Sequence, residues 1–102
     1  MPLMHSVHFK FKAHATEADR KNVFDLAQTL VADCGGEEAG ILYFDFGENA
    51  DQRKGVEFVE HIVFVNDEAL QEFRRHPRHV AFAEAMSAIA DWTVGDRPCP
   101  YL

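Results

Sequence analysis

The segment MHSVHFKFK, residues 4–12, decides the fold of this chain because its side chains alternate in character. His5, Val7, Phe9 and Phe11 form one row, and the intervening positions are mostly polar or charged. A period of two residues predicts a β-strand with one buried face. This strand therefore places a histidine at one end of an otherwise apolar row.

A long helix is predicted directly after this strand. Thr16, followed three residues later by Asp19, is a typical helix start. Gly35 and Gly36 end the helix because glycine accepts the left-handed conformation that follows a helix C-terminus. We expect the helix to bury Val23, Phe24, Ala27, Leu30, Val31 and Cys34.

The rest of the chain contains three more strands and two shorter helices. Residues 41–46 and 56–65 are strands that are apolar on both faces, joined by a polar loop over 47–55. Asn66 or Asp67 begins a helix that ends near Phe73, and Pro77 separates it from a last helix over about 78–90. Residues 91–96 form a fourth strand, and the tail 97–102 cannot pair as a central strand because it contains two prolines.

The predicted order is β-α-β-β-α-β, which is the ferredoxin-like pattern of the α+β class. We therefore expect residues 1–102 to form one domain, with a four-stranded antiparallel sheet covered by helices on one face. The second and third strands are apolar on both faces, and soluble monomers avoid an uncovered apolar sheet. The sequence thus predicts a homodimer in which two copies pack sheet to sheet.

Composition excludes several classes of partner. The chain has 102 residues, 47% of them hydrophobic, and a formal net charge of -7. Acidic character disfavours binding to nucleic acids and to anionic membrane surfaces. Because the sequence begins with no targeting leader and has no apolar run of membrane-spanning length, we expect a soluble cytoplasmic protein. Cys34 and Cys99 match no metal or redox spacing and are expected to be free thiols.

A second histidine lies on an apolar face in the segment FRRHPRHVAF, residues 73–82. His79, Phe82, Ala83 and Met86 follow helical spacing and share one helix face. Histidine is the side chain whose charge is most easily changed near neutral pH. Two imidazoles directed at one apolar interior would form a candidate functional site, although the pattern does not name a substrate.

Three segments together resemble the stress-responsive dimeric α/β-barrel (Dabb) family. They are the opening strand His5–Lys12, the strand Glu60–Val65, and the His-Pro-x-His element with its following residues, His76–Phe82. The resemblance covers about residues 4–96 and implies two ferredoxin-like subunits whose sheets close into one barrel. It agrees with the homodimer expected from the apolar strands.

The resemblance also implies a site and a chemistry. The family includes plant stress-responsive A/B barrel proteins and a plant polyketide cyclase of the olivetolic acid cyclase type. That cyclase uses a first-strand histidine and the second histidine of His-Pro-x-His, which match His5 and His79. It also uses a tyrosine where this chain has Phe73, which has no hydroxyl. We expect His79 and His5 to be catalytic. The ligand-binding residues expected here are Phe73, Phe82, Met86, Val7 and Phe9.

Structural roles compete with functional ones at each histidine. His79 can donate a hydrogen bond to a nearby carbonyl, and His5 can sit at the rim of the core. His76 is expected to hydrogen-bond within its turn, and His61 to lie in the core or at an interface. The sequence contains no metal-binding motif and no nucleotide-binding loop, so we expect neither a metal nor a cofactor.

Three functions are compatible with the sequence. The first is an enzyme that performs cofactor-independent proton transfer, of the cyclase or lyase kind, on a hydrophobic oxygenated compound. The second is a stress-associated dimer that binds such a compound in the same apolar pocket without turnover. The third is a structural dimer with no ligand, which a cavity lined by both imidazoles would disfavour.

Overall fold

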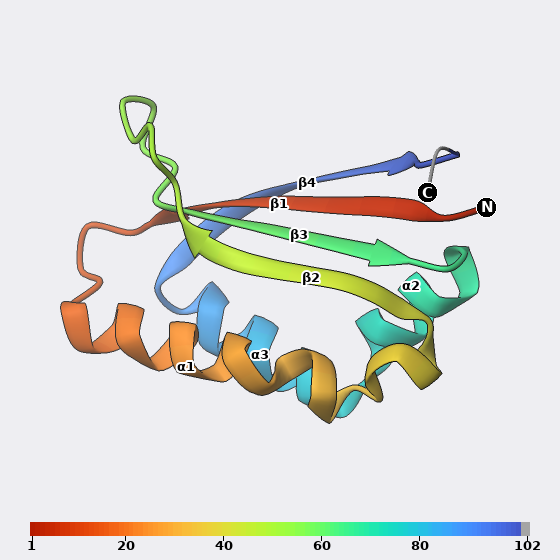
Figure 1. Ribbon diagram of the computed structural model, residues 1–102. Helices are drawn as coiled ribbons and strands as arrows, with labels where there is room; N and C mark the ends of the chain where they lie inside the picture. Colours follow the sequence, from red (N-terminus) through yellow and green to blue (C-terminus); the bar gives the residue numbers. More distant parts are fainter. Residues whose placement is uncertain (101–102) are drawn as a thin grey trace.

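A computed structural model describes residues 1–100, which form one four-stranded sheet with the helices packed on one of its faces (Figure 1). The elements are β1 (Leu3–Phe11), α1 (Glu17–Asp33), η1 (Gly36–Ala39), β2 (Ile41–Glu48), β3 (Phe58–Phe64), α2 (Asp67–Arg75), α3 (Pro77–Ser87) and β4 (Ala90–Pro98). The strand order is β2-β3-β1-β4, and neighbouring strands are antiparallel. This arrangement confirms the predicted ferredoxin-like fold.

The ends of α1 follow the signals in the sequence. The Asp19 amide donates to the Thr16 hydroxyl at 3.1 Å, and the Thr16 amide donates to the Asp19 carboxylate at 2.9 Å. These reciprocal bonds satisfy amides that have no partner inside the helix. The helix ends at Cys34, and Gly35 follows with a φ of 101°. A short 3₁₀ turn, η1, then leads to β2 and was not predicted.

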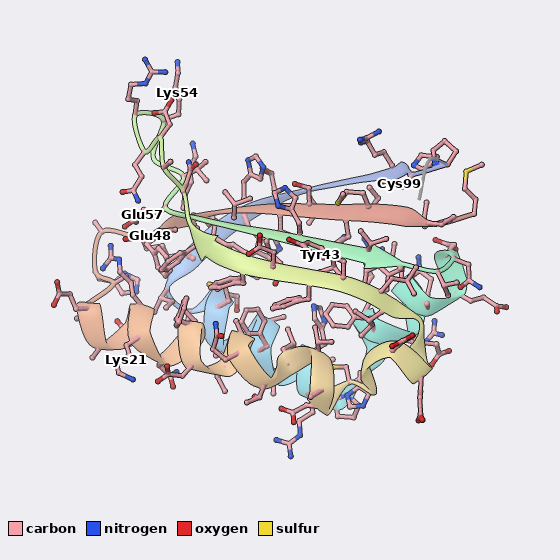
Figure 2. All side chains as sticks on the ribbon, viewed as in Figure 1. Lys21, Tyr43, Glu48, Lys54, Glu57 and Cys99 are labelled. Carbon is pink, nitrogen blue, oxygen red and sulfur yellow. The ribbon has the colours of Figure 1, made fainter. Side chains whose placement is uncertain are left out.

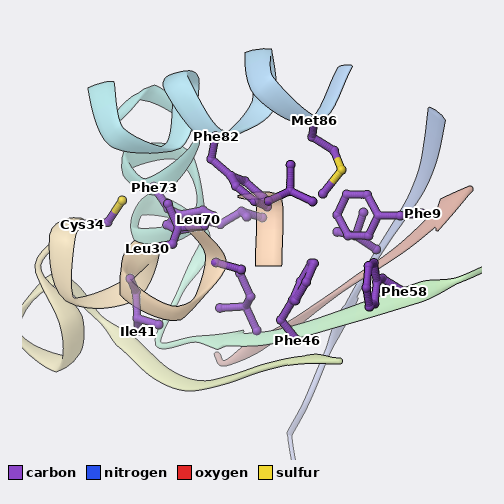
Figure 3. Close-up of a cluster of buried hydrophobic side chains, with 14 of the residues drawn as sticks. Phe9, Leu30, Cys34, Ile41, Phe46, Phe58, Leu70, Phe73, Phe82 and Met86 are labelled. Atoms are coloured by element: carbon purple, nitrogen blue, oxygen red, sulfur yellow. The ribbon is translucent and has the colours of Figure 1, made fainter. Parts of the chain in front are cut away.

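The core lies between the sheet and the helices. Val7 and Phe9 of β1 are buried there, and Figure 3 shows Phe82 and Met86 reaching from α3 toward the phenyl rings of the sheet. One prediction for α1 was wrong: Phe24 is 38% exposed. Its ring contacts the edge of the core at Phe46, with 6.0 Å between ring centroids, because it lies at the margin of the buried helix face.

A β-bulge interrupts the alternation of side chains along β2. The register pairs Ile41 with Phe64 but Tyr43 with Val63, so one extra residue lies between these pairs. Since a bulge shifts the alternation by one position, Ile41 is buried in the core although strict alternation would place it on the same face as Tyr43. Tyr43 lies on the opposite face of the sheet and is 52% exposed.

No helix covers the outer face of the sheet within residues 1–100 (Figure 1). Figure 2 shows Tyr43 on β2, and Lys54 at the tip of the polar loop that projects beyond the sheet between β2 and β3. At the other edge, β4 extends two residues past the predicted end, and the Cys99 amide donates to the Pro2 carbonyl at 2.8 Å. Tyr101 and Leu102, the end of the predicted tail, lie outside the described residues.

Candidate functional site

A cavity of about 210 Å³ lies between the inner face of the sheet and helix α3. Its apolar wall is formed by Val7 and Phe9 of β1 and by Phe82 and Met86 of α3. Trp92 and Val94 of the edge strand β4 also line it and are partly exposed, so β4 forms its outer rim. The four polar or charged side chains that line this cavity are His5, Glu60, Arg74 and His79.

His5 is fixed from the side of the sheet. The register of β1 and β4 places it opposite Asp96, and its Nδ1 lies 2.5 Å from the Asp96 Oδ1 atom. A carboxylate only accepts hydrogen bonds, so the proton of a neutral His5 ring lies on Nδ1. Arg74 donates to the other Asp96 oxygen at 3.0 Å and holds that carboxylate in place. The Nε2 atom of His5 forms no hydrogen bond with residues 1–100 and is free to bind a ligand.

His79 is fixed by the junction between α2 and α3. Pro77 is the first residue of α3, and the His76 Nδ1 atom caps this helix by accepting from the Arg78 amide at 3.1 Å. This confirms the predicted turn role of His76. One turn into α3, His79 Nδ1 donates to the Arg74 carbonyl at 3.3 Å. A carbonyl only accepts, so the Nε2 atom of neutral His79 carries a lone pair.

Burial sets the charge of His79. Desolvation lowers its pKa below the usual 6.5, and the nearby His5 ring adds a smaller effect in the same direction. The neutral imidazole is therefore favoured at neutral pH, which is the form that accepts a proton. The Phe73 ring packs against it, with 4.5 Å between ring centroids.

Glu60 is a polar residue of the cavity that the sequence reasoning did not select. It lies on β3 between Val7 and Phe46 of the neighbouring strands and is only 3% exposed. Among residues 1–100, its Oε2 atom has no hydrogen-bond partner, and burial raises the pKa of the carboxyl to about 7. The signal in the sequence is the single carboxylate in the apolar row Phe58, Glu60, Ile62, Phe64.

The structure brings together most of the residues proposed from the sequence. His5, His79, Val7, Phe9, Phe82 and Met86 line this one cavity. Phe73 does not line it; its buried ring lies behind His79 and lines a separate cavity beside Cys34. His61 is half-buried on the outer face of β3, away from the cavity. Cys34 and Cys99 are free and buried.

Two kinds of feature are absent from the part of the chain that the structure describes. No group of three or more histidine, cysteine, aspartate or glutamate side chains is arranged to hold a metal ion within residues 1–100. Among the same residues, none of the helices has both the length and the apolar character needed to cross a membrane.

Comparisons with known proteins agree with the fold. Residues 3–99 match the family model described as the stress responsive A/B barrel domain. A dimeric ferredoxin-like protein of unknown function from Thermobifida fusca has a TM-score of 0.85 and 15% identity, covering 97% of this chain and 92% of that one. A Dabb family protein from Mesorhizobium loti has a TM-score of 0.77 and 18% identity, covering 96% of each chain.

A third similar structure is that of SnoaB from Streptomyces nogalater, described as a cofactor-independent oxygenase. Its TM-score is 0.74 at 17% identity, covering 96% of this chain and 92% of that one. None of the curated proteins compared with the sequence matches it. At these identities the structural likeness establishes the fold alone.

Proposed function

The chain belongs to the stress-responsive A/B barrel domain family, and on that premise we propose that its cavity binds a hydrophobic oxygenated compound and transfers a proton on it without a cofactor. The observation that carries this proposal is one apolar cavity lined by two oriented imidazoles, His5 and His79. Apolar walls with a few placed polar groups are typical of small-molecule sites.

The two histidines have different environments and therefore different roles. His79 is the general base, because burial favours its neutral form and its Nδ1 proton is held by the Arg74 carbonyl, which directs the lone pair to Nε2. His5 assists it: the Asp96 carboxylate fixes the His5 ring through Nδ1 and leaves its Nε2 atom to exchange a proton with the ligand. The pair can thus remove a proton at one position of a ligand and return it at another, as cyclase-like or lyase-like reactions require.

We propose that the functional unit is a homodimer. The uncovered outer face of the sheet carries Tyr43, and Val59 and His61 on β3, so burying it against a second copy would remove apolar surface from water. Similar structures from Thermobifida fusca and Bacteroides fragilis are described as dimeric. The cavity lies on the other side of this sheet and stays accessible from β4.

Binding without turnover is the second candidate, and Phe73 favours it. The cyclase that the sequence resembles has a tyrosine at this position, whereas here an apolar ring packs on His79. The Glu60 carboxyl does not replace the missing tyrosine hydroxyl, because it comes from β3 in the sheet and Phe73 lies on α2. A protein with this arrangement would hold the ligand in the same place and orient it without driving the reaction forward.

Deuterium exchange distinguishes these functions. The probe is benzylacetone, a phenyl-substituted alkyl ketone with exchangeable protons beside its carbonyl, incubated in deuterium oxide and followed by nuclear magnetic resonance (NMR). We expect the protein to accelerate this exchange and His79→Ala to remove most of the acceleration, because the variant lacks the proposed general base. The matched control is His8→Ala, whose imidazole is exposed on the outer face.

Each result has one meaning. Saturable binding with no faster exchange supports the non-catalytic function. Exchange that is equally fast in wild type and His79→Ala contradicts the role of His79, and absence of any binding contradicts the proposed site for this class of ligand.

A further inference from the structure

Glu60 is the polar group of the cavity that the proposed histidine chemistry leaves unused. It stands on the central strand pair of the sheet, opposite Val7 on β1 and Phe46 on β2. Among residues 1–100, no group donates a hydrogen bond to its Oε2 atom, which is shielded from solvent. Buried polar atoms normally have a hydrogen-bond partner. A carboxyl without one in a cavity wall therefore indicates that a bound ligand supplies the partner.

The surroundings of Glu60 favour its neutral form. Burial is the cause of its raised pKa, and among residues 1–100 no positively charged side chain offsets that effect. An ionised carboxylate in such a place would be costly, because its charge has neither water nor a cation to stabilise it. A neutral carboxyl has one O–H donor, which can bond to an oxygen of a ligand.

We propose that Glu60 contacts the ligand directly and donates a hydrogen bond to its carbonyl oxygen, so that the cavity selects ketones over hydrocarbons and amines of the same shape. This inference rests on the proposed function, because it concerns the same cavity. It adds a substrate class: a compound with a carbonyl oxygen next to a carbon or hydroxyl that can give up a proton.

The donors and acceptors of the cavity are complementary to such a compound. The charged and titratable groups around it are His5 from β1, Arg74 from α2, His79 from α3 and, behind His5, Asp96 from β4. Both imidazoles offer an Nε2 lone pair, His5 from β1 and His79 from α3, while Glu60 offers a proton from β3, the strand beside β1. A carbonyl with an adjacent acidic proton satisfies both kinds of group at once.

The same charges disfavour an amine. The Arg74 guanidinium is positive and lines the cavity, and the one carboxylate beside it, Asp96, is already engaged by His5 and Arg74. A protonated amine in this cavity would therefore be repelled by the Arg74 guanidinium.

The assignment fits the proton transfer proposed for His79. When His79 Nε2 removes the proton beside the carbonyl, the C–H bond breaks, an N–H bond forms, and the electron pair moves onto the carbonyl oxygen. The Glu60 O–H donates to that oxygen as its negative charge develops, which stabilises the enolate. Return of the proton from His79 to carbon reverses the step and leaves both groups as they began.

Binding measurements with two variants test this role. The probes are benzylacetone, the amine in which an amino group replaces its carbonyl, and butylbenzene, which has neither group. Affinities are measured by NMR titration at pH 6 for wild type, Glu60→Gln and Glu60→Leu. The glutamine side chain has the same length as glutamate and carries a hydrogen-bond donor, but it cannot ionise. The leucine side chain has a similar volume and no donor.

We expect wild type to bind benzylacetone more tightly than butylbenzene or the amine. Glu60→Gln should keep this preference, and Glu60→Leu should weaken ketone binding about three- to tenfold, the effect of one lost hydrogen bond, without weakening butylbenzene. Raising the pH above 7 should weaken ketone binding to wild type and not to Glu60→Gln, because only the wild-type carboxyl ionises.

Three results would overturn the inference: equal ketone affinity in wild type and Glu60→Leu, tighter binding of the amine than of the ketone, or loss of ketone binding in Glu60→Gln as large as in Glu60→Leu. None of these would affect the histidine site, which His79→Ala tests separately through deuterium exchange. Unchanged exchange in His79→Ala, with ketone selectivity lost in Glu60→Leu, would contradict the histidine role and leave the Glu60 inference standing.

Discussion

Replacing Glu60 by glutamine should make the folded protein more stable, by an amount that grows with pH. The folded state raises the pKa of this carboxyl from 4.5 to about 7, because burial disfavours its charge. Each pH unit of difference between the folded and unfolded pKa is worth about 1.4 kcal/mol, so an ionised Glu60 costs the fold about 3 kcal/mol. Glutamine has a similar shape and no charge, so the variant avoids this cost.

The sign of the pH dependence follows from proton binding. Between pH 4.5 and about 7 the folded state holds the Glu60 proton more tightly than the unfolded state does. The contribution of Glu60 to stability is therefore fully present below pH 4.5 and is lost as pH rises through about 7. The unfolding free energy of Glu60→Gln minus that of wild type should increase by about 3 kcal/mol from pH 4.5 to pH 8.

Urea unfolding at several pH values measures this difference, with Trp92 fluorescence as the probe and chain concentration held constant because association also stabilises the fold. Taking the difference between variant and wild type cancels the titration of every other group. The matched control is Glu84→Gln, which removes an exposed carboxylate from α3 and should show no comparable rise. A difference for Glu60→Gln that stays constant within about 1 kcal/mol from pH 4.5 to 8 would refute the reasoning, because the carboxyl would then ionise freely in the folded state.

The remaining predictions concern the histidines, the ring behind them and the dimer. His5→Ala and His79→Ala should each weaken benzylacetone binding at a stability cost of about 0.5–3 kcal/mol. Their effects on binding should not add in the double variant, whereas full additivity would mean that the two histidines do not act on one ligand. The ring protons of His79 should titrate with a midpoint below 6.5 in NMR, since burial lowers its pKa, so the stability that it contributes is present above pH 6.5 and lost as pH falls; a midpoint of 6.5 or higher would contradict the burial argument. Phe73→Ala should cost about 3–5 kcal/mol in urea unfolding, because it empties a buried site against His79, and a loss under 1 kcal/mol would mean that the ring does not support that wall. Light scattering should give twice the chain mass of 11.6 kDa for wild type and a lower mass for Tyr43→Asp, whereas a wild-type monomer at micromolar concentration would contradict the sheet-to-sheet dimer.

Most of the fold could be predicted because its signals are local. The alternation in residues 4–12, the Thr16–Asp19 pair and Pro77 each determine an element from neighbouring residues alone. The bulge after Ile41 was missed because it arises from the pairing of β2 with β3, and no local residue requires it. Phe24 was placed in the core because periodicity gives the centre of a buried helix face more reliably than its margin.

The candidate site was predictable only in part. His5 and His79 stand out in sequence because each interrupts or begins an apolar row, and the fold brings both rows to one cavity. Asp96 and Arg74 could not be identified as the supports of His5, because that contact requires the register of β4 and the position of α2. Glu60 was visible as a lone carboxylate, but its importance depends on the absence of any donor around it, which only the three-dimensional packing defines.

The central claim is that the cavity under α3 is the ligand site and that both imidazoles face the ligand. Histidine-selective NMR during a benzylacetone titration tests it most directly, because the chain has six histidines on different surfaces. The ring resonances of His5 and His79 should shift together with one half-saturation concentration, while those of His8 and His61 on the outer face of the sheet should not move. Shifts confined to His8 and His61, or no shift at His5 and His79 when the ketone saturates the protein, would contradict the account.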